Sequence, residues 1–254
     1  MYNILYRSIF PVAGLLCILL VWQFYVDYFD VASVVLPSPL AILEASQLYF
    51  PELMRNTWPT LVECVLGFVL AIGVGIPLAV VLAGSRVLNL TLYPILIALQ
   101  SVPKVAVAPI ILVWFGLGIE SKLAIAFLVA FFPIVVDTTA GLHSTPVGFL
   151  ELARSLRASR RQVFFKVQLP AALPFVFAGA KVAVTLTVIG AVIGEFVGSD
   201  AGLGNLLLTA NSQLNGPLAW AALIWLSVLG MVLFLLVSVA EWLFMPWARG
   251  KRGH

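Results

Sequence analysis

Five ionisable side chains lie inside long apolar stretches of the sequence: Glu63, Lys104, Asp137, Lys181 and Glu195. In hydrocarbon a charge costs about 2.5–3.5 kcal/mol on insertion scales, so such residues pair or mark a transport pathway. Lys104 directly follows a proline, and a proline break frees backbone groups that must face protein or a wet cavity. We therefore predict that Lys104, Lys181 and Glu195 line a pathway. The alternatives are a pair between Lys181 and Asp137 on adjacent helices and, for the three carboxylates, snorkelling or pairing near an interface.

The sequence offers little for catalysis or metal binding. Its two histidines are His143 and His254, and its two cysteines, Cys17 and Cys64, lie in apolar runs without metal-ligand spacing. We expect both cysteines to be small buried hydrophobes. Neither an H-E-x-x-H zinc motif nor a G-x-x-x-x-G-K-[S/T] phosphate loop occurs. These absences predict a chain with no catalytic group, no metal site and no cofactor of its own.

The composition indicates that the solvent of this chain is lipid. Of 254 residues, 62% are hydrophobic and 10% are charged, and the mean hydropathy is +1.10. A soluble domain is about 45–50% apolar and about 25% charged, and a folded chain of this size still exposes roughly a quarter of its surface. A soluble enzyme, a nucleic-acid-binding module and a disordered protein are therefore excluded.

Apolar runs of about 20 residues are long enough to cross a bilayer as helices. They predict an all-α membrane protein, one domain over residues 1–254, with six transmembrane helices. The third run contains three prolines, so we expect a kinked or broken helix there. Between the spans we expect a short interfacial helix within 27–57 and an irregular or re-entrant segment over 198–217. The predicted spans are 9–26, 58–83, 88–116, 121–141, 171–197 and 218–245.

Lys and Arg predict the orientation, because cytoplasmic loops carry the excess of positive charge. One alternating set of loops and termini holds ten of these residues, whereas the other set holds only Arg55 and Lys122. Both termini are therefore predicted to be cytoplasmic. The fifth span also contains Gly190, Gly194 and Gly198, and glycines at this spacing let helix backbones approach closely. We expect packing within the subunit, with a dimer seam or a narrow pore wall as alternatives.

The long basic loop 142–169 is predicted to be cytoplasmic and to form two short amphipathic helices. Leu152 and Leu156 repeat at helical spacing in the first half, as do two valines in the second half. We expect the second helix to end at Pro170, where the next span begins. The basic residues of this loop have an alternative explanation: they could simply form a solvated surface that faces the lipid headgroups.

The loop resembles the cytoplasmic "EAA" loop of the permeases of ABC importers. The resemblance rests on Glu151-x-Ala153, Leu156-x-Ala158 and the closing Leu169-Pro170. It extends from about residue 36 onward, toward the branch that handles nitrate, taurine and alkanesulfonates. The further motifs are Leu36-Pro37-Ser38-Pro39, Val102-Pro103-Lys104-Val105-Ala106, Trp114-Phe115-Gly116, Ser121-Lys122, Phe132-Pro133 and Gly202-Leu203-Gly204.

Two positions depart from the family pattern. Arg157 stands where the family usually has glycine, and Leu152 replaces the first of two usual alanines. Glycine would ease a sharp break between the two short helices. With Arg157 we expect the break to use ordinary dihedral angles, and the role of the loop to be kept.

The resemblance implies a fold of the type I ABC-importer permease kind and a set of partners. A second permease copy would complete the pathway, two cytoplasmic ATP-binding subunits would bind ATP and Mg²⁺, and an external binding protein would deliver the solute. The lipid bilayer, here the bacterial inner membrane, is the remaining partner, and nucleic acid is not one. The residues implied to dock the ATP-binding subunit are Glu151, Leu152, Ala153, Leu156, Arg157 and Ala158.

The sequence does not identify the solute, and two other functions are alternatives to that of an importer permease. Permeases of similar appearance handle sulfonates, taurine, nitrate, bicarbonate or pyrimidine-type precursors, and Lys104 and Lys181 favour an anion. An ion-coupled secondary transporter or channel would use the intramembrane charges, but such carriers often have repeated halves with matching broken helices. An intramembrane enzyme would need a catalytic constellation that the two histidines and the motifs do not supply.

Overall fold

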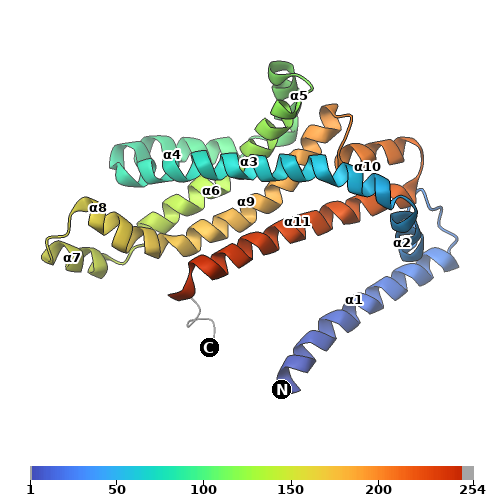
Figure 1. Ribbon diagram of the computed structural model, residues 1–254, viewed down its shortest axis with the longest axis horizontal. Helices are drawn as coiled ribbons and strands as arrows, with labels where there is room; N and C mark the ends of the chain where they lie inside the picture. Colours follow the sequence, from blue (N-terminus) through green and yellow to red (C-terminus); the bar gives the residue numbers. More distant parts are fainter. Residues whose placement is uncertain (1, 248–254) are drawn as a thin grey trace.

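The computed structural model describes residues 2–247, with side chains from Phe10 onward, and this part of the chain contains helices and no strand. It confirms the expected all-α fold. Long helices lie side by side, and short helices connect them at the two ends (Figure 1). The elements are α1 Tyr2–Tyr28, α2 Pro39–Leu48, α3 Phe50–Gly84, α4 Arg86–Gln100, α5 Lys104–Phe115, α6 Ile119–His143, α7 Val147–Ser155, α8 Arg160–Val163, the π-helical turn η1 Phe164–Gln168, α9 Leu169–Gly198, α10 Leu203–Ser212 and α11 Gly216–Phe244.

Within the part of the chain that the structure describes, five helices are long and apolar enough to cross a membrane, and the pair α4–α5 makes a sixth span if it is counted as one. The two helices of this pair meet at an angle of 97°, so the expected break in the third span is present. It falls at Pro103, which caps α5 and has no backbone N–H to continue a helix. Pro94 and Pro109, by contrast, lie inside α4 and α5.

Two segments contain more helix than the sequence indicated. The predicted span 58–83 lies within a longer helix that begins at Phe50, because Pro51 fits the first turn of a helix, where an N–H has no partner. The segment 198–217, expected to be irregular or re-entrant, contains helix α10. Apolar Leu203, Leu206 and Ala210 of this helix are buried in the main core cluster, so the helix is held by packing.

Close packing around α6 organises the bundle. A Cβ atom added to Gly67 of α3 would lie 2.6 Å from the Cβ of Ala126, and one added to Gly190 of α9 would lie 2.7 Å from the Cα of the same residue. Ala126 of α6 is therefore enclosed by glycines of two neighbouring helices. Gly194 lies in the same way against Lys122 of α6, while Gly198 faces leucine side chains. The three glycines of α9 face residues of their own subunit.

The loop between α6 and α9 differs in two ways from expectation. Its second helix does not end at Pro170, since α8 continues through the π turn into α9 as one apolar helix, Arg160–Gly198. In the π turn the N–H of Leu169 bonds to the carbonyl of Phe164, five residues back. A wider turn suits the residues before a proline, because a proline ring clashes with the carbonyl four residues before it.

The second difference concerns Arg157, whose φ angle is +52°. The prediction of ordinary dihedral angles was wrong. Arg157 N–H bonds to the carbonyl of Arg154, and Ala158 N–H bonds to the carbonyl of Ala153, which is the Schellman pattern that closes a helix. The break thus keeps the left-handed geometry that glycine would adopt at no cost, although an L side chain pays about 1–2 kcal/mol for it.

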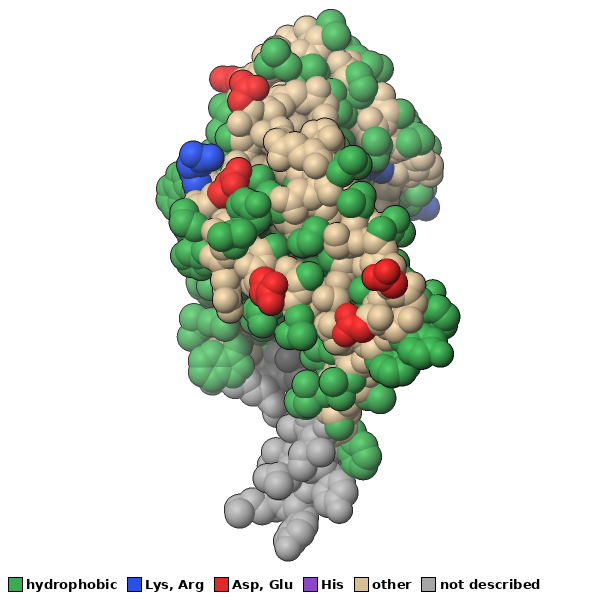
Figure 2. All heavy atoms as spheres, turned by 90° about the vertical axis from the view of Figure 1, so that its right-hand side faces the viewer, with side chains coloured by type: hydrophobic (Ala, Val, Ile, Leu, Met, Phe, Trp, Pro, Cys, Tyr) green, Lys and Arg blue, Asp and Glu red, His purple; other side chains and the backbone are tan. Residues whose placement is uncertain are grey.

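The end of the molecule opposite the loop has a different surface. It faces the viewer in Figure 2 and bears separate acidic side chains, with hydrophobic side chains around them. Helix α1 extends away from the other long helices in Figure 1 and makes its contacts mainly with α2. Most of its described apolar side chains are exposed, as expected of a helix that is surrounded by lipid.

We predict that Gly190→Ala lowers the thermal stability of the purified protein strongly, because the added methyl group would meet the backbone of α6. Gly73→Ala is the matched control, since a Cβ at Gly73 has nothing within 4 Å. In a helix interior, glycine to alanine is otherwise stabilising by about 0.5–1 kcal/mol. Thermal unfolding in detergent, followed by size-exclusion fluorescence, measures both. Equal midpoints for the two variants would contradict the close contact.

Candidate functional site

The loop 142–169 presents apolar side chains outward at one end of the bundle. Leu152 is 56% exposed and Leu156 is 73% exposed, whereas Ala153 of the same helix is buried. Glu151 and Arg157 are exposed as well, and Ala158 is half-buried. Exposed leucines outside the lipid-spanning part of a helix bundle indicate a surface that another protein covers.

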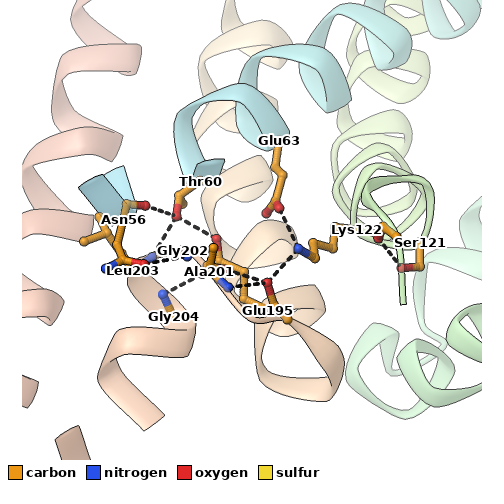
Figure 3. A network of polar contacts seen from close by, with 12 residues as sticks. Asn56, Thr60, Glu63, Ser121, Lys122, Glu195, Ala201, Gly202, Leu203 and Gly204 are labelled. Carbon is orange, nitrogen blue, oxygen red and sulfur yellow. Dashed lines mark hydrogen bonds and ion pairs between the residues drawn. The ribbon is translucent and has the colours of Figure 1, made fainter. Parts of the chain in front are cut away.

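A second candidate site is a network of buried polar groups, which Figure 3 shows at the opposite end of α9. Glu195 is 1% exposed, and both of its carboxylate oxygens accept hydrogen bonds. The hydroxyl of Thr60 donates to Oε1 over 2.6 Å, and the backbone N–H of Gly204 donates to Oε2 over 2.5 Å. Thr60 in turn accepts the N–H of Leu203 over 2.9 Å. Glu195 therefore ties α3 and α9 to the first turn of α10.

Lys122 extends this network to α6. In the count of positive charges it was assigned to the less basic side, at the start of the predicted span 121–141, and it is buried in the first turn of α6. Its Nζ lies 3.2 Å from Oε1 of Glu63 and donates to the hydroxyl of Ser199 over 2.6 Å. Ser199 also donates to the carbonyl of Ala201. Charge pairing at this depth offsets the cost of burying either group alone.

The network fixes the turn between α9 and α10. Gly202 has a φ angle of +113° and its N–H bonds to the Asn56 side chain over 3.0 Å. A Cβ on Gly202 would overlap the carboxylate of Glu195, so only glycine fits. Glu195 and Glu63 stand out in the sequence as charges in apolar stretches, but their partners were not predicted. Asn56, Thr60 and Glu63 repeat at spacings of four and three in an apolar run, and this pattern places them on one face of α3.

The lysine in the fifth span has a different partner from the one considered. Lys181 Nζ lies 2.7 Å from Oε2 of Glu241 on α11, so the pairing with Asp137 was wrong. Asp137 instead lies beside Gly179, whose missing side chain leaves room for its carboxylate. Lys181 and Glu195 thus both have protein partners rather than an open face.

Lys104 lies at the break between α4 and α5. Its Nζ donates to the carbonyl of Gln100, near the end of α4, and lies 5.3 Å from the centre of the Phe132 ring. The side chain is half-buried. A cation over an aromatic face is attracted by the ring electrons, so the protein holds a positive charge at the corner of the bent span.

Among the described residues, no group of three or more His, Cys, Asp or Glu could hold a metal ion.

We predict that Thr60→Val destabilises the protein, by about 2–4 kcal/mol, because it leaves a buried carboxylate oxygen and the N–H of Leu203 without partners. Thr57→Val is the matched control, since the hydroxyl of Thr57 bonds only to the carbonyl of Leu53 in its own helix. Thermal unfolding, with limited proteolysis between α9 and α10, measures the effect. Indistinguishable behaviour of the two variants would show that the network does not hold the turn.

Comparisons with known proteins agree with this arrangement of helices. The chain is 35% identical to a probable ABC transporter permease protein of Haemophilus influenzae, over 89% of this chain and 91% of the relative. It is 33% identical to the formylaminopyrimidine transport permease protein of Halalkalibacterium halodurans, over 96% of this chain and 98% of the relative. Among solved structures, the inward-facing MetNI methionine ABC transporter matches with a TM-score of 0.67 at 23% identity, covering 77% of this chain and 97% of that one. This last match shows a shared fold.

The family described as "Binding-protein-dependent transport system inner membrane component" matches residues 71–244. The matched range contains the exposed loop, Lys104 and most of the buried network, including Glu195. It covers well over half of the sequence, and the relatives above match at nearly full length. The chain belongs to the family of inner membrane components of binding-protein-dependent transport systems.

Proposed function

We propose that two copies of this permease enclose the translocation pathway of an ATP-driven importer. Two cytoplasmic ATP-binding subunits bind ATP and Mg²⁺ and dock on the loops, and an external binding protein delivers the solute. We assign ATP hydrolysis to these partners and a non-catalytic role to the chain itself, in keeping with the lack of a G-x-x-x-x-G-K-[S/T] phosphate loop in its sequence. Nucleotide hydrolysis then has to reach the membrane helices through a physical contact between subunits.

The observation that carries this proposal is the exposed apolar face of α7. Leu152 and Leu156 lie on the side of the loop that no described part of the bundle covers. Burying two leucines in a groove contributes roughly 3–6 kcal/mol, at about 1.5–3 each. Glu151 and Arg157 can make polar contacts at the rim, and small, half-buried Ala158 permits close approach. Ala153, expected to serve in the same way, is buried inside the subunit. The loop has the chemistry of a docking element.

The loop is also mechanically connected to the centre of the permease. Helix α8 continues without a break into α9, and α9 packs along α6 through its glycines. A displacement of the loop is therefore transmitted along a helix and not lost in a flexible linker. This connection supports coupling between the docked subunit and the transmembrane helices.

The proposed orientation places both termini and the loop in the cytoplasm. Basic residues gather in the loop, whereas the opposite end displays acidic side chains (Figure 2). Because Lys and Arg are retained on the cytoplasmic side, this asymmetry favours an external position for the turn between α9 and α10. The buried network then lies near the outer surface, on the side from which a solute would arrive.

We propose a small, anionic solute. Relatives are named for sulfonates in Bacillus subtilis, at 30% identity, and for nitrate in Synechocystis, at 28% identity. Relatives named for formylaminopyrimidine and for riboflavin match at 33% and 35%, so the names alone favour no single class. Lys104 supports an anion, since among the described residues it is the lysine of the predicted spans that has no carboxylate partner.

We predict that Leu156→Asp weakens or abolishes co-purification of the ATP-binding subunit, because it places a charge in an apolar contact. Glu151→Lys should impair substrate-stimulated ATPase activity more than assembly. Leu214→Asp is the control for the first variant, as Leu214 is 68% exposed but lies between α10 and α11. Assembly and stimulated ATPase at wild-type levels in Leu156→Asp would overturn the docking assignment.

We predict that Lys104→Met lowers solute uptake into proteoliposomes by about tenfold or more while the complex still assembles. The reason is that one charge-assisted contact is worth about 1.5–3 kcal/mol. Lys104→Arg keeps the charge and should retain most of the uptake. Unchanged uptake and ATPase stimulation in Lys104→Met would mean that Lys104 only holds the corner between α4 and α5.

A further inference from the structure

A cavity of about 740 Å³ lies between the loop and the helix ends beneath it. The ends of α3 and α6 form one wall, and α7 and the beginning of the α8–α9 helix form the other. Val80, Ala83 and Leu142 make the floor apolar. The cavity is therefore apolar toward the membrane-spanning helices and bordered by the loop on its other side.

The polar part of the lining has a single sign of charge. Arg154 and Arg160 contribute guanidinium groups, and His143 and Gln168 contribute an imidazole and an amide. No Asp or Glu is among the lining residues, and Glu151, the one acidic residue of the loop, is not part of the cavity. A cavity lined in this way attracts anions.

The two arginines have no carboxylate partner in residues 10–247, where the ion pairs are Lys122–Glu63 and Lys181–Glu241. The neighbouring arginine differs, because Arg161 lies over the ring of Phe165 at 5.8 Å and is outside the cavity. Arginine has a planar fork of N–H donors that matches the oxygens of a phosphate group. Two such forks, one from α7 and one from α8, line the same cavity and can bind one group together.

We propose that this cavity binds an oxyanion of the phosphate class, such as the headgroup of an anionic phospholipid or a soluble phosphate compound. Basic pockets at the ends of membrane helices favour acidic headgroups, and the apolar floor accommodates the non-polar part of such a molecule. The exposed leucines of the docking surface, Leu152 and Leu156, do not line the cavity. Ala158 borders both sites, but the arginines of the cavity and the leucines of the docking surface are different residues of the same loop.

The test uses the assembled transporter, purified with its ATP-binding subunits. Native mass spectrometry measures phosphatidylglycerol bound per complex, with phosphatidylcholine as the neutral lipid. Arg160→Gln should lower the apparent affinity for phosphatidylglycerol about tenfold, as expected for the loss of one charge-assisted contact. Arg161→Gln removes the same charge outside the cavity and should leave the affinity unchanged. Arg154→Gln, if it assembles, should reproduce the effect of Arg160→Gln.

A second arm separates lipid from soluble ligands. Inorganic phosphate is titrated at constant ionic strength, and thermal stability of the complex is measured in phosphatidylcholine nanodiscs. Stabilisation by phosphate that Arg160→Gln removes assigns a soluble oxyanion, and saturable phosphatidylglycerol binding without it assigns the headgroup. Both results support the site. Equal responses of Arg160→Gln and Arg161→Gln, or binding of neither probe, would overturn the proposal.

Discussion

Close contact of three helix backbones along α6 is the constraint on which the other features depend. Glycines of α3 and α9 enclose Ala126, and Gly194 leaves room for Lys122 one turn earlier on α6. Only at that separation can the Lys122 ammonium reach Glu63 of α3 and the hydroxyl beyond α9. In lipid there is no hydrophobic drive between helices, so packing and buried polar contacts hold them together. Here the close approach of α3 and α9 to α6 provides both the packing and the buried polar contacts.

The buried network shows how polar groups specify a turn inside an apolar solvent. Glu195 takes its donors from a side chain of α3 and from a backbone N–H of α10. Because hydrocarbon offers no substitute donors, the position of α10 is fixed by where these groups are satisfied. Apolar packing of Leu203 and Leu206 into the core acts in the same direction. The turn therefore has one arrangement that meets both demands.

Features that depend on local chemistry could be predicted from the sequence. Apolar length predicted the membrane spans, and Pro103 predicted the broken third one. The extra helix α10 was missed, because Gly, Asn and Ser in 198–217 are typical of irregular segments and its stability comes from tertiary burial. The partners of Lys181 and Glu195 lie 60 and 135 residues away in sequence, and spacing alone does not contain such distances. The backbone conformation of Arg157 was mispredicted. A non-glycine residue is expected to avoid a positive φ angle, but here the Schellman hydrogen bonds offset the free-energy cost of that conformation.

The π turn at Phe164–Gln168 sets the rotational phase between the loop and the membrane helix. An α-helix advances about 100° per residue, and a π turn accommodates one residue more than the regular winding. A single extra residue in the π turn thus determines the direction in which the arginines of α8 point relative to the glycine face of α9. Loss of that residue would leave both helices intact and turn one against the other by about a quarter of a rotation. The loop and the membrane helices would then each be correctly folded, but the loop would face a different direction relative to the membrane helices.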